Sequence, residues 1–148
     1  MKNIILVTHG EFAAGILTSM ELVFGKMENV DYVSVSAQER LPEITASIEA
    51  KINGFCNEES TVILSDIVGG STTRAAMELL EKRKKVYLIS GLNLGLLLEV
   101  AMLSLSGDEQ SDRQALRDVI ERSKSTICLV NDLTDRQDGC VVSDFDEL

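Results

Sequence analysis

The chain has 148 residues, 45% hydrophobic and 26% charged, a composition that predicts one globular domain and excludes an intrinsically disordered chain. Its 14 Lys and Arg against 24 Asp and Glu give a net charge of −10, so no nucleic-acid partner is expected. The 3 cysteines lack C-x-x-C spacing and no apolar run is long enough to span a bilayer, so we predict a cytoplasmic protein without disulfides.

The first half of the chain alternates short β-branched runs with longer segments of helical periodicity. A continuous apolar run over residues 4–7 predicts a strand buried on both faces, which ends just before residues 8–10. Apolar residues at helical spacing follow, and Gly25 is a suitable C-terminal stop. Residues 30–35 predict a second, more polar strand nearer a sheet edge, and Pro42 opens a second helix.

The second half continues this alternation. Residues 61–65 and 86–90 predict two more strands, and each leads through a glycine-containing loop into a helix. Ser111 with Gln114 predicts a capping box at the start of a fifth helix. Residues 126–130, Thr-Ile-Cys-Leu-Val, predict a last strand, after which a chain rich in Asp begins.

This order of elements predicts the α/β fold class, with one doubly wound, mostly parallel sheet and helices on both faces. We predict a single domain over residues 1–131, followed by an acidic tail over residues 132–148. Ligands of such sheets bind beyond the carboxyl ends of the strands, where the strand order reverses. A strand order of 2-1-3-4 makes the first and third strands neighbours and puts His9 beside Asp66.

His9 is the only histidine of the chain. A neutral imidazole can attack phosphorus with one ring nitrogen while an acceptor holds the N–H of the other. Asp66 suits that role, because a carboxylate fixes the tautomer and stabilises the positive charge that grows on the ring. A lone histidine at a strand end more often has a structural role, but here three unusual loops converge on one sheet edge. We therefore predict His9 and Asp66 as the catalytic pair.

A glycine-rich segment opens the third helix at Gly69, Gly70 and Ser71. Glycines allow close approach of a ligand, and the helix N-terminus offers N–H groups to an anion. The same segment also fits a tight turn with Ser71 as an ordinary N-cap. Asn93 either caps the fourth helix, the commoner role, or steadies the loop of His9. We predict these four residues as the phosphate-binding set.

Several chemistries leave no trace in the sequence. There is no G-x-x-x-x-G-K-[ST] loop for direct use of ATP and no G-x-G-x-x-G loop for a dinucleotide. One histidine and no cysteine pair leave a transition-metal site without ligands. We predict neither a cofactor nor a metal.

At these residues the sequence resembles the mannose-type enzyme IIA component of the bacterial phosphoenolpyruvate-dependent sugar phosphotransferase system, from Met1 to about Val130. Three segments in order carry the resemblance: His9-Gly10 at the end of a buried strand, Asp66-x-x-Gly69-Gly70-Ser71 before Ala75-Ala76, and Gly91-x-Asn93-Leu94 before Leu97 and Glu99.

The resemblance implies partners and roles. The general histidine phosphocarrier protein would phosphorylate His9, and a IIB component would take the group and phosphorylate sugar at a membrane permease. Asp66 would be the partner of the histidine, and Ser71 with nearby backbone would contact phosphate. The family also implies a homodimer in which the last strand, here residues 126–130, is exchanged in antiparallel pairing between subunits.

Four positions depart from the family pattern. Thr72, Thr73 and Arg74 stand where Pro, an aromatic or apolar residue and Asn are usual, and Gly95 stands where Pro usually follows Asn-Leu. These changes leave the reacting groups in place, and we expect them to alter the rim that a partner touches, which bears on the IIB partner and the sugar.

Two other functions stay open. The phosphotransfer subunit of dihydroxyacetone kinase shares this architecture, although the intact Gly-Gly-Ser segment favours the sugar system. A non-catalytic regulatory or anion-binding module is the alternative from a different class. A histidine-phosphatase-like enzyme is disfavoured, because that chemistry needs a second histidine and an arginine beside the first.

Overall fold

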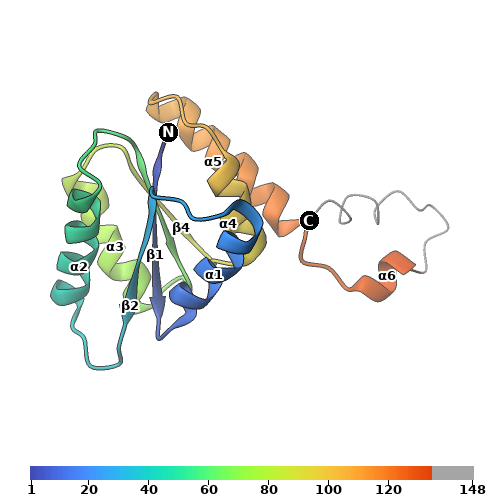
Figure 1. Cartoon of the computed structure of the whole chain (residues 1–148), viewed down its shortest axis with the longest axis horizontal. Coiled ribbons are helices and arrows are strands. Elements are labelled where there is room, and N and C mark those ends of the chain that lie inside the picture. Colours follow the sequence, from blue (N-terminus) through green and yellow to red (C-terminus); the bar gives the residue numbers. More distant parts are fainter. Residues whose placement is uncertain (135–148) are drawn as a thin grey trace.

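A single parallel sheet of 4 strands, in the order β2-β1-β3-β4, forms the centre of the computed structural model, which describes residues 1–134 (Figure 1). The strands are β1 (Asn3–His9), β2 (Val30–Val35), β3 (Thr61–Ser65) and β4 (Val86–Ser90). The predicted α/β class, the strand order 2-1-3-4 and the edge position of the second strand are confirmed.

Helices cover both faces of the sheet, as predicted. One face carries α1 (Phe12–Phe24), α4 (Leu94–Met102) and α5 (Glu109–Lys124), and the other carries α2 (Leu41–Gly54) and α3 (Ser71–Lys82). Successive β1 side chains serve the two layers in turn: Ile4 and Leu6 pack in the first core, Ile5 and Val7 in the second. All four side chains are fully buried, which explains the unbroken apolar run of this strand.

The parallel register brings the ends of β1 and β3 together. Val7 lies opposite Ser65, so that His9 and Asp66 leave the sheet side by side. Beyond β1 the chain turns at Gly10, whose φ of +56° suits glycine, and the Thr8 hydroxyl accepts a hydrogen bond from the Ala13 N–H in the first turn of α1 (2.8 Å). The first strand and first helix are therefore fixed on either side of His9.

The predicted strand over residues 126–130 is wrong for the single chain. This segment leaves α5 as a turn and irregular backbone, and α6 (Val130–Thr134) begins at its last residue. Ile127, Leu129 and Val130 are largely exposed. A strand needs a neighbour with free backbone groups, and the segment lies away from the sheet (Figure 1). Exchange of this segment between two subunits involves a second copy and stays a prediction.

Two further predictions differ from the structure in detail. The fifth helix is capped by Asp108 and not by Ser111: the Asp108 carboxylate accepts from the Ser111 N–H (2.9 Å) and hydroxyl (2.7 Å). Of the predicted acidic tail, residues 132–134 belong to α6, and residues 135–148 lie outside the described part. None of the described helices is both long and apolar enough to cross a membrane.

Candidate functional site

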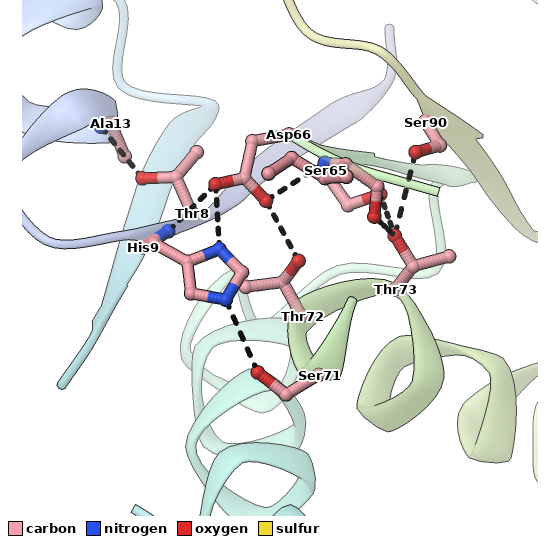
Figure 2. Close-up of polar contacts among 10 residues, drawn as sticks. Thr8, His9, Ala13, Ser65, Asp66, Ser71, Thr72, Thr73 and Ser90 are labelled. Carbon is pink, nitrogen blue, oxygen red and sulfur yellow. Dashed lines mark hydrogen bonds and ion pairs between the residues drawn. The ribbon is translucent and has the colours of Figure 1, made fainter. Parts of the chain in front are cut away.

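His9 and Asp66 meet at the carboxyl edge of the sheet, where β1 and β3 end (Figure 2). The Asp66 Oδ2 atom lies 2.9 Å from the ring Nδ1 of His9 and also accepts a hydrogen bond from the backbone N–H of His9 at 2.9 Å. One carboxylate oxygen thus contacts both the main chain and the ring of the histidine. The juxtaposition predicted from the strand order is present.

The second oxygen of Asp66 is equally occupied. Oδ1 accepts from the backbone N–H of Ile67 (3.0 Å) and from the hydroxyl of Thr72 (2.8 Å). With the two bonds on Oδ2, all of the roughly four lone-pair directions of a carboxylate are used. The Asp66 side chain is only 11% exposed. The carboxylate is therefore held in one orientation and has no free lone pair.

Two opposing effects set the pKa of Asp66. Burial, the largest single effect, raises the pKa, but the hydrogen bonds from the His9 backbone, the His9 ring and Thr72, with the charge of the ring, together lower it below the usual 3.8. Asp66 is therefore ionised at neutral pH and can only accept hydrogen bonds. A neutral His9 ring consequently carries its proton on Nδ1, which leaves a lone pair on Nε2.

The free nitrogen of His9 faces the start of α3. The His9 side chain is 47% exposed, and the hydroxyl of Ser71 lies 3.3 Å from Nε2. Because Nε2 carries the lone pair in this tautomer, Ser71 is the donor of this bond. The nitrogen that can attack an electrophile is thus accessible, and a hydroxyl marks the place where a group bound to it would lie (Figure 2).

The glycine segment lets α3 begin directly beside the histidine. Gly69 adopts a φ of +81°, and a Cβ atom on Gly70 would lie 3.3 Å from Cε1 of His9 and 3.2 Å from the Ile67 carbonyl oxygen. The first intrahelical bond of α3 runs from the Arg74 N–H to the Gly70 oxygen. The N–H groups of residues 71–73 thus precede the first helical bond, at the end of the helix that attracts anions.

Asn93 caps α4, the commoner of its two predicted roles. Its Oδ1 accepts from the Leu96 N–H (3.0 Å) and its Nδ2 donates to the Gly91 oxygen (3.3 Å). Asn93 also lines a cavity of about 450 Å³ with Phe12 and Ile16 of α1. Both ends of its amide are used within its own turn, and the predicted phosphate contact stays a prediction.

Two threonines of the site were misjudged from the sequence. Thr72 and Thr73 are 0% and 5% exposed, so they are not part of a rim that a partner touches, whereas Arg74 is exposed. The Thr73 hydroxyl donates to the Ile67 oxygen (2.7 Å) and accepts from Ser65 (2.7 Å), which ties the loop to the sheet. The only signal was two hydroxyl side chains directly after Gly-Gly-Ser, where a helix begins.

Metal ligands do not gather in the part of the chain that the structure covers. Among residues 1–134, no group of three or more His, Cys, Asp or Glu side chains is arranged to hold an ion. The chemistry available at this site is that of one nucleophilic imidazole with an oriented carboxylate.

Comparison with known proteins assigns the family. The family model described as the PTS system fructose IIA component matches residues 3–117. A sorbose-specific EIIA component of Klebsiella pneumoniae is 32% identical over 111 residues, which cover 74% of this chain and 81% of that protein. A fructose-specific EIIA component of Bacillus subtilis is 25% identical over 125 residues, or 84% of this chain and 81% of that protein.

Solved structures agree with these relatives. The phosphotransferase system component EIIA from Streptococcus agalactiae superposes with a TM-score of 0.74 at 25% identity, covering 88% of this chain and 98% of that one. A PTS IIA protein from Streptococcus pneumoniae shares the fold at 18% identity, with a TM-score of 0.77 over 90% of this chain and 96% of that one. The chain therefore belongs to the fructose- and mannose-type IIA family and is an EIIA-type component of a sugar phosphotransferase system.

Proposed function

We propose that His9 accepts a phosphoryl group on Nε2 from the general histidine phosphocarrier protein and passes it to a IIB component. The observation that carries this proposal is the contact between Asp66 Oδ2 and His9 Nδ1, 2.9 Å, in a histidine whose side chain is half-exposed. Family membership supports the same reaction. The relatives are named for sorbose, fructose and mannose, so the proposal concerns the phosphoryl step and not one sugar.

The transfer is a substitution at phosphorus. The lone pair of Nε2 forms the new N–P bond while the N–P bond of the donor's phosphohistidine breaks, and the donor nitrogen keeps that electron pair. The His9 ring becomes positively charged because its Nδ1 proton stays in place, and the carboxylate of Asp66 stabilises this charge. In the second transfer a nucleophile of the IIB component attacks the phosphorus, and the N–P bond at Nε2 breaks with its electron pair returning to His9. Transfer needs no proton to leave His9.

The start of α3 would receive the phosphoryl oxygens. The Ser71 hydroxyl already lies 3.3 Å from Nε2, and the N–H groups of residues 71–73 precede the first helical hydrogen bond. The helix dipole adds about 0.3–1 kcal/mol to the binding of an anion, and direct N–H bonds add more. Gly69 and Gly70 allow the loop to approach that closely.

Exposed apolar side chains around the histidine support docking of a protein donor. Ile67 and Val68 follow Asp66 directly, and Phe12 lies on α1 next to the loop of His9. All three are exposed in spite of their size. A phosphohistidine of a carrier reaches Nε2 only if the two protein surfaces meet, and apolar contacts stabilise such a complex. With these partners, we propose that the reaction takes place in the cytoplasm.

The labelling experiment is direct. The chain is incubated with phosphoenolpyruvate and the purified general phosphocarrier proteins, and the product is tested for an acid-labile, base-stable phosphoryl group. We expect stoichiometric label on wild type and none on a folded His9→Gln variant. Label on His9→Gln, or its absence from wild type when a known IIA protein is labelled in parallel, would overturn the proposal.

We extend the proposal to assembly: two copies form a dimer in which residues 126–130 pair beyond β4. In the described chain β4 has a strand on one side only, and Ile127 and Leu129 are exposed. Ile127→Asp should convert the dimer to a monomer in sedimentation equilibrium. Leu22→Asp, which puts the same charge at an exposed leucine of α1, is the control and should stay dimeric. A monomeric wild type contradicts this part.

A further inference from the structure

The side chain of Thr72 contacts the site through its hydroxyl. It is the second residue of α3, its side chain is completely buried, and its Oγ1 lies 2.8 Å from Oδ1 of Asp66. A carboxylate only accepts hydrogen bonds and a hydroxyl has a single proton, so the direction of this bond is fixed. Thr72 therefore donates its one proton to Asp66.

Of the four hydrogen bonds to the Asp66 carboxylate, this is the one that comes from α3. Oδ2 receives its two bonds from His9 at the end of β1. Oδ1 receives one bond from Ile67, the next residue along the chain, and the other from Thr72 on α3. The Ile67 bond is local to the Asp66 loop, whereas the Thr72 bond resists rotation of the carboxylate relative to the helix that faces Nε2.

We propose that Thr72 is a positioning residue for phosphoryl transfer, because its hydroxyl holds the Asp66 carboxylate in the orientation that keeps the proton of His9 on Nδ1. This inference rests on the proposed phosphorylation of His9. Without the hydroxyl, Oδ1 loses its donor from α3 and the carboxylate can turn away from the ring. A ring that is released from Oδ2 also populates the Nε2–H tautomer, which has no lone pair on the attacking nitrogen.

The proposed role of Thr72 can be tested separately from the binding of a partner protein. Thr72 is buried, so a carrier protein cannot touch it. Thr72→Val keeps the shape and removes the hydroxyl, and Thr72→Ser keeps the hydroxyl. Thr45→Val is a matched control. Thr45 is also a buried helical threonine with a bonded hydroxyl, but its partners are the Leu41 and Ala75 carbonyl oxygens and, at 3.3 Å, the Glu78 carboxylate, none of which belongs to the site of His9.

The tautomer of His9 is the first readout, because the only histidine gives a single set of ring ¹⁵N resonances. In the neutral form of the ring we expect the proton on Nδ1 in wild type, Thr72→Ser and Thr45→Val, and a mixture of the Nδ1–H and Nε2–H tautomers in Thr72→Val. We also expect kcat for transfer from the phosphorylated carrier to fall about tenfold in Thr72→Val with little change in KM, since a hydrogen bond to a charged group is lost. Thr72→Ser should restore kcat.

A folded Thr72→Val variant with the wild-type tautomer and wild-type kcat would overturn the inference. If that variant does not fold, hydroxyl proton exchange in the wild-type protein tests the bond. A buried hydroxyl that donates a hydrogen bond exchanges its proton slowly with water. A Thr72 hydroxyl proton that exchanges as fast as those of exposed threonines would therefore refute the bond to Asp66. The tautomer measurement needs no phosphoryl transfer. A wild type that is not phosphorylated therefore ends the proposed function, whereas an unchanged tautomer in Thr72→Val ends only the role of Thr72.

Discussion

Replacing Asp66 with Asn changes the charge of the site while keeping its shape. The carboxylate of Asp66 accepts four hydrogen bonds, two on each oxygen. An amide offers one oxygen, so its NH₂ must replace the other. The Thr72 hydroxyl can turn to accept from that NH₂, which favours the arrangement with the amide oxygen still on His9. The neutral ring then keeps its tautomer, but the cationic ring of the phosphorylated state loses its counter-charge.

The expected loss is large. A hydrogen bond to a charged group contributes about 1.5–3 kcal/mol against about 0.5–1.5 kcal/mol for a neutral one, and the charge of the phosphorylated ring adds to the difference. We therefore expect transfer to slow by at least tenfold, with the roughly 10⁴-fold effect of the same change in a serine-protease triad as the upper guide. The fold should survive. Chelators should not affect this step, because the oxygens of Asp66 have no lone pair left for a metal.

Rapid-quench transfer from the phosphorylated carrier protein measures the effect. Asp112→Asn is the matched control, because Asp112 is a buried carboxylate that accepts from Ser106 and Gly107 at the start of α5. That variant should be less stable in urea and transfer at the wild-type rate. Equal rates for wild type and folded Asp66→Asn would show that the charge of Asp66 does not assist transfer. A chelator effect on this step would show that a metal takes part.

Three further predictions follow from the same geometry. The pKa of Asp66 lies below the usual 3.8 in the folded protein, so the stability that its hydrogen bonds add is present above pH 3.8. That stability is lost as the pH falls through the lower pKa of the folded state. A ¹³C titration of the Asp66 carboxyl with a midpoint above 3.8 would contradict this. Gly70→Ala should slow transfer several-fold without unfolding, since its Cβ would press on Cε1 of His9 at 3.3 Å; an unchanged rate counts against the close approach. Asn93→Ala should lower the free energy of unfolding by about 1 kcal/mol in urea, through loss of the α4 cap, and Asn93→Asp should not. If Asn93 also contacts phosphate, Asn93→Asp should slow phosphoryl transfer although it keeps the helix cap, because the new carboxylate repels the phosphoryl group.

Periodicity and strand order predicted much of the fold and the contact between His9 and Asp66. The apolar run of β1 indicated a strand covered on both faces, and the alternation of elements gave a parallel sheet. Once the first and third strands are neighbours, His9 and Asp66 must leave the same edge together. Both inferences depend on the course of the backbone, which the spacing of apolar residues in the sequence indicates directly.

The errors concern contacts that depend on tertiary placement. The β-branched residues at 126–130 suit a strand, but a pattern cannot say whether a neighbouring strand is present. Ser111 fits a capping position, yet Asp108 lies one turn earlier and accepts from it. The hydroxyl of Thr72 reaches Asp66 only because α3 begins beside β3. That placement of the helix cannot be predicted from the two residues themselves.

We propose that Nε2 of His9 carries the phosphoryl group while Asp66 retains the proton on Nδ1. The most direct test is NMR of the chain labelled with ¹⁵N-histidine, after phosphorylation by phosphoenolpyruvate and the general phosphocarrier proteins. We expect one-bond ³¹P–¹⁵N coupling to Nε2 and a proton coupled to Nδ1. Coupling of phosphorus to Nδ1, or a phosphorylated chain whose histidine nitrogens show no phosphorus coupling, would contradict it.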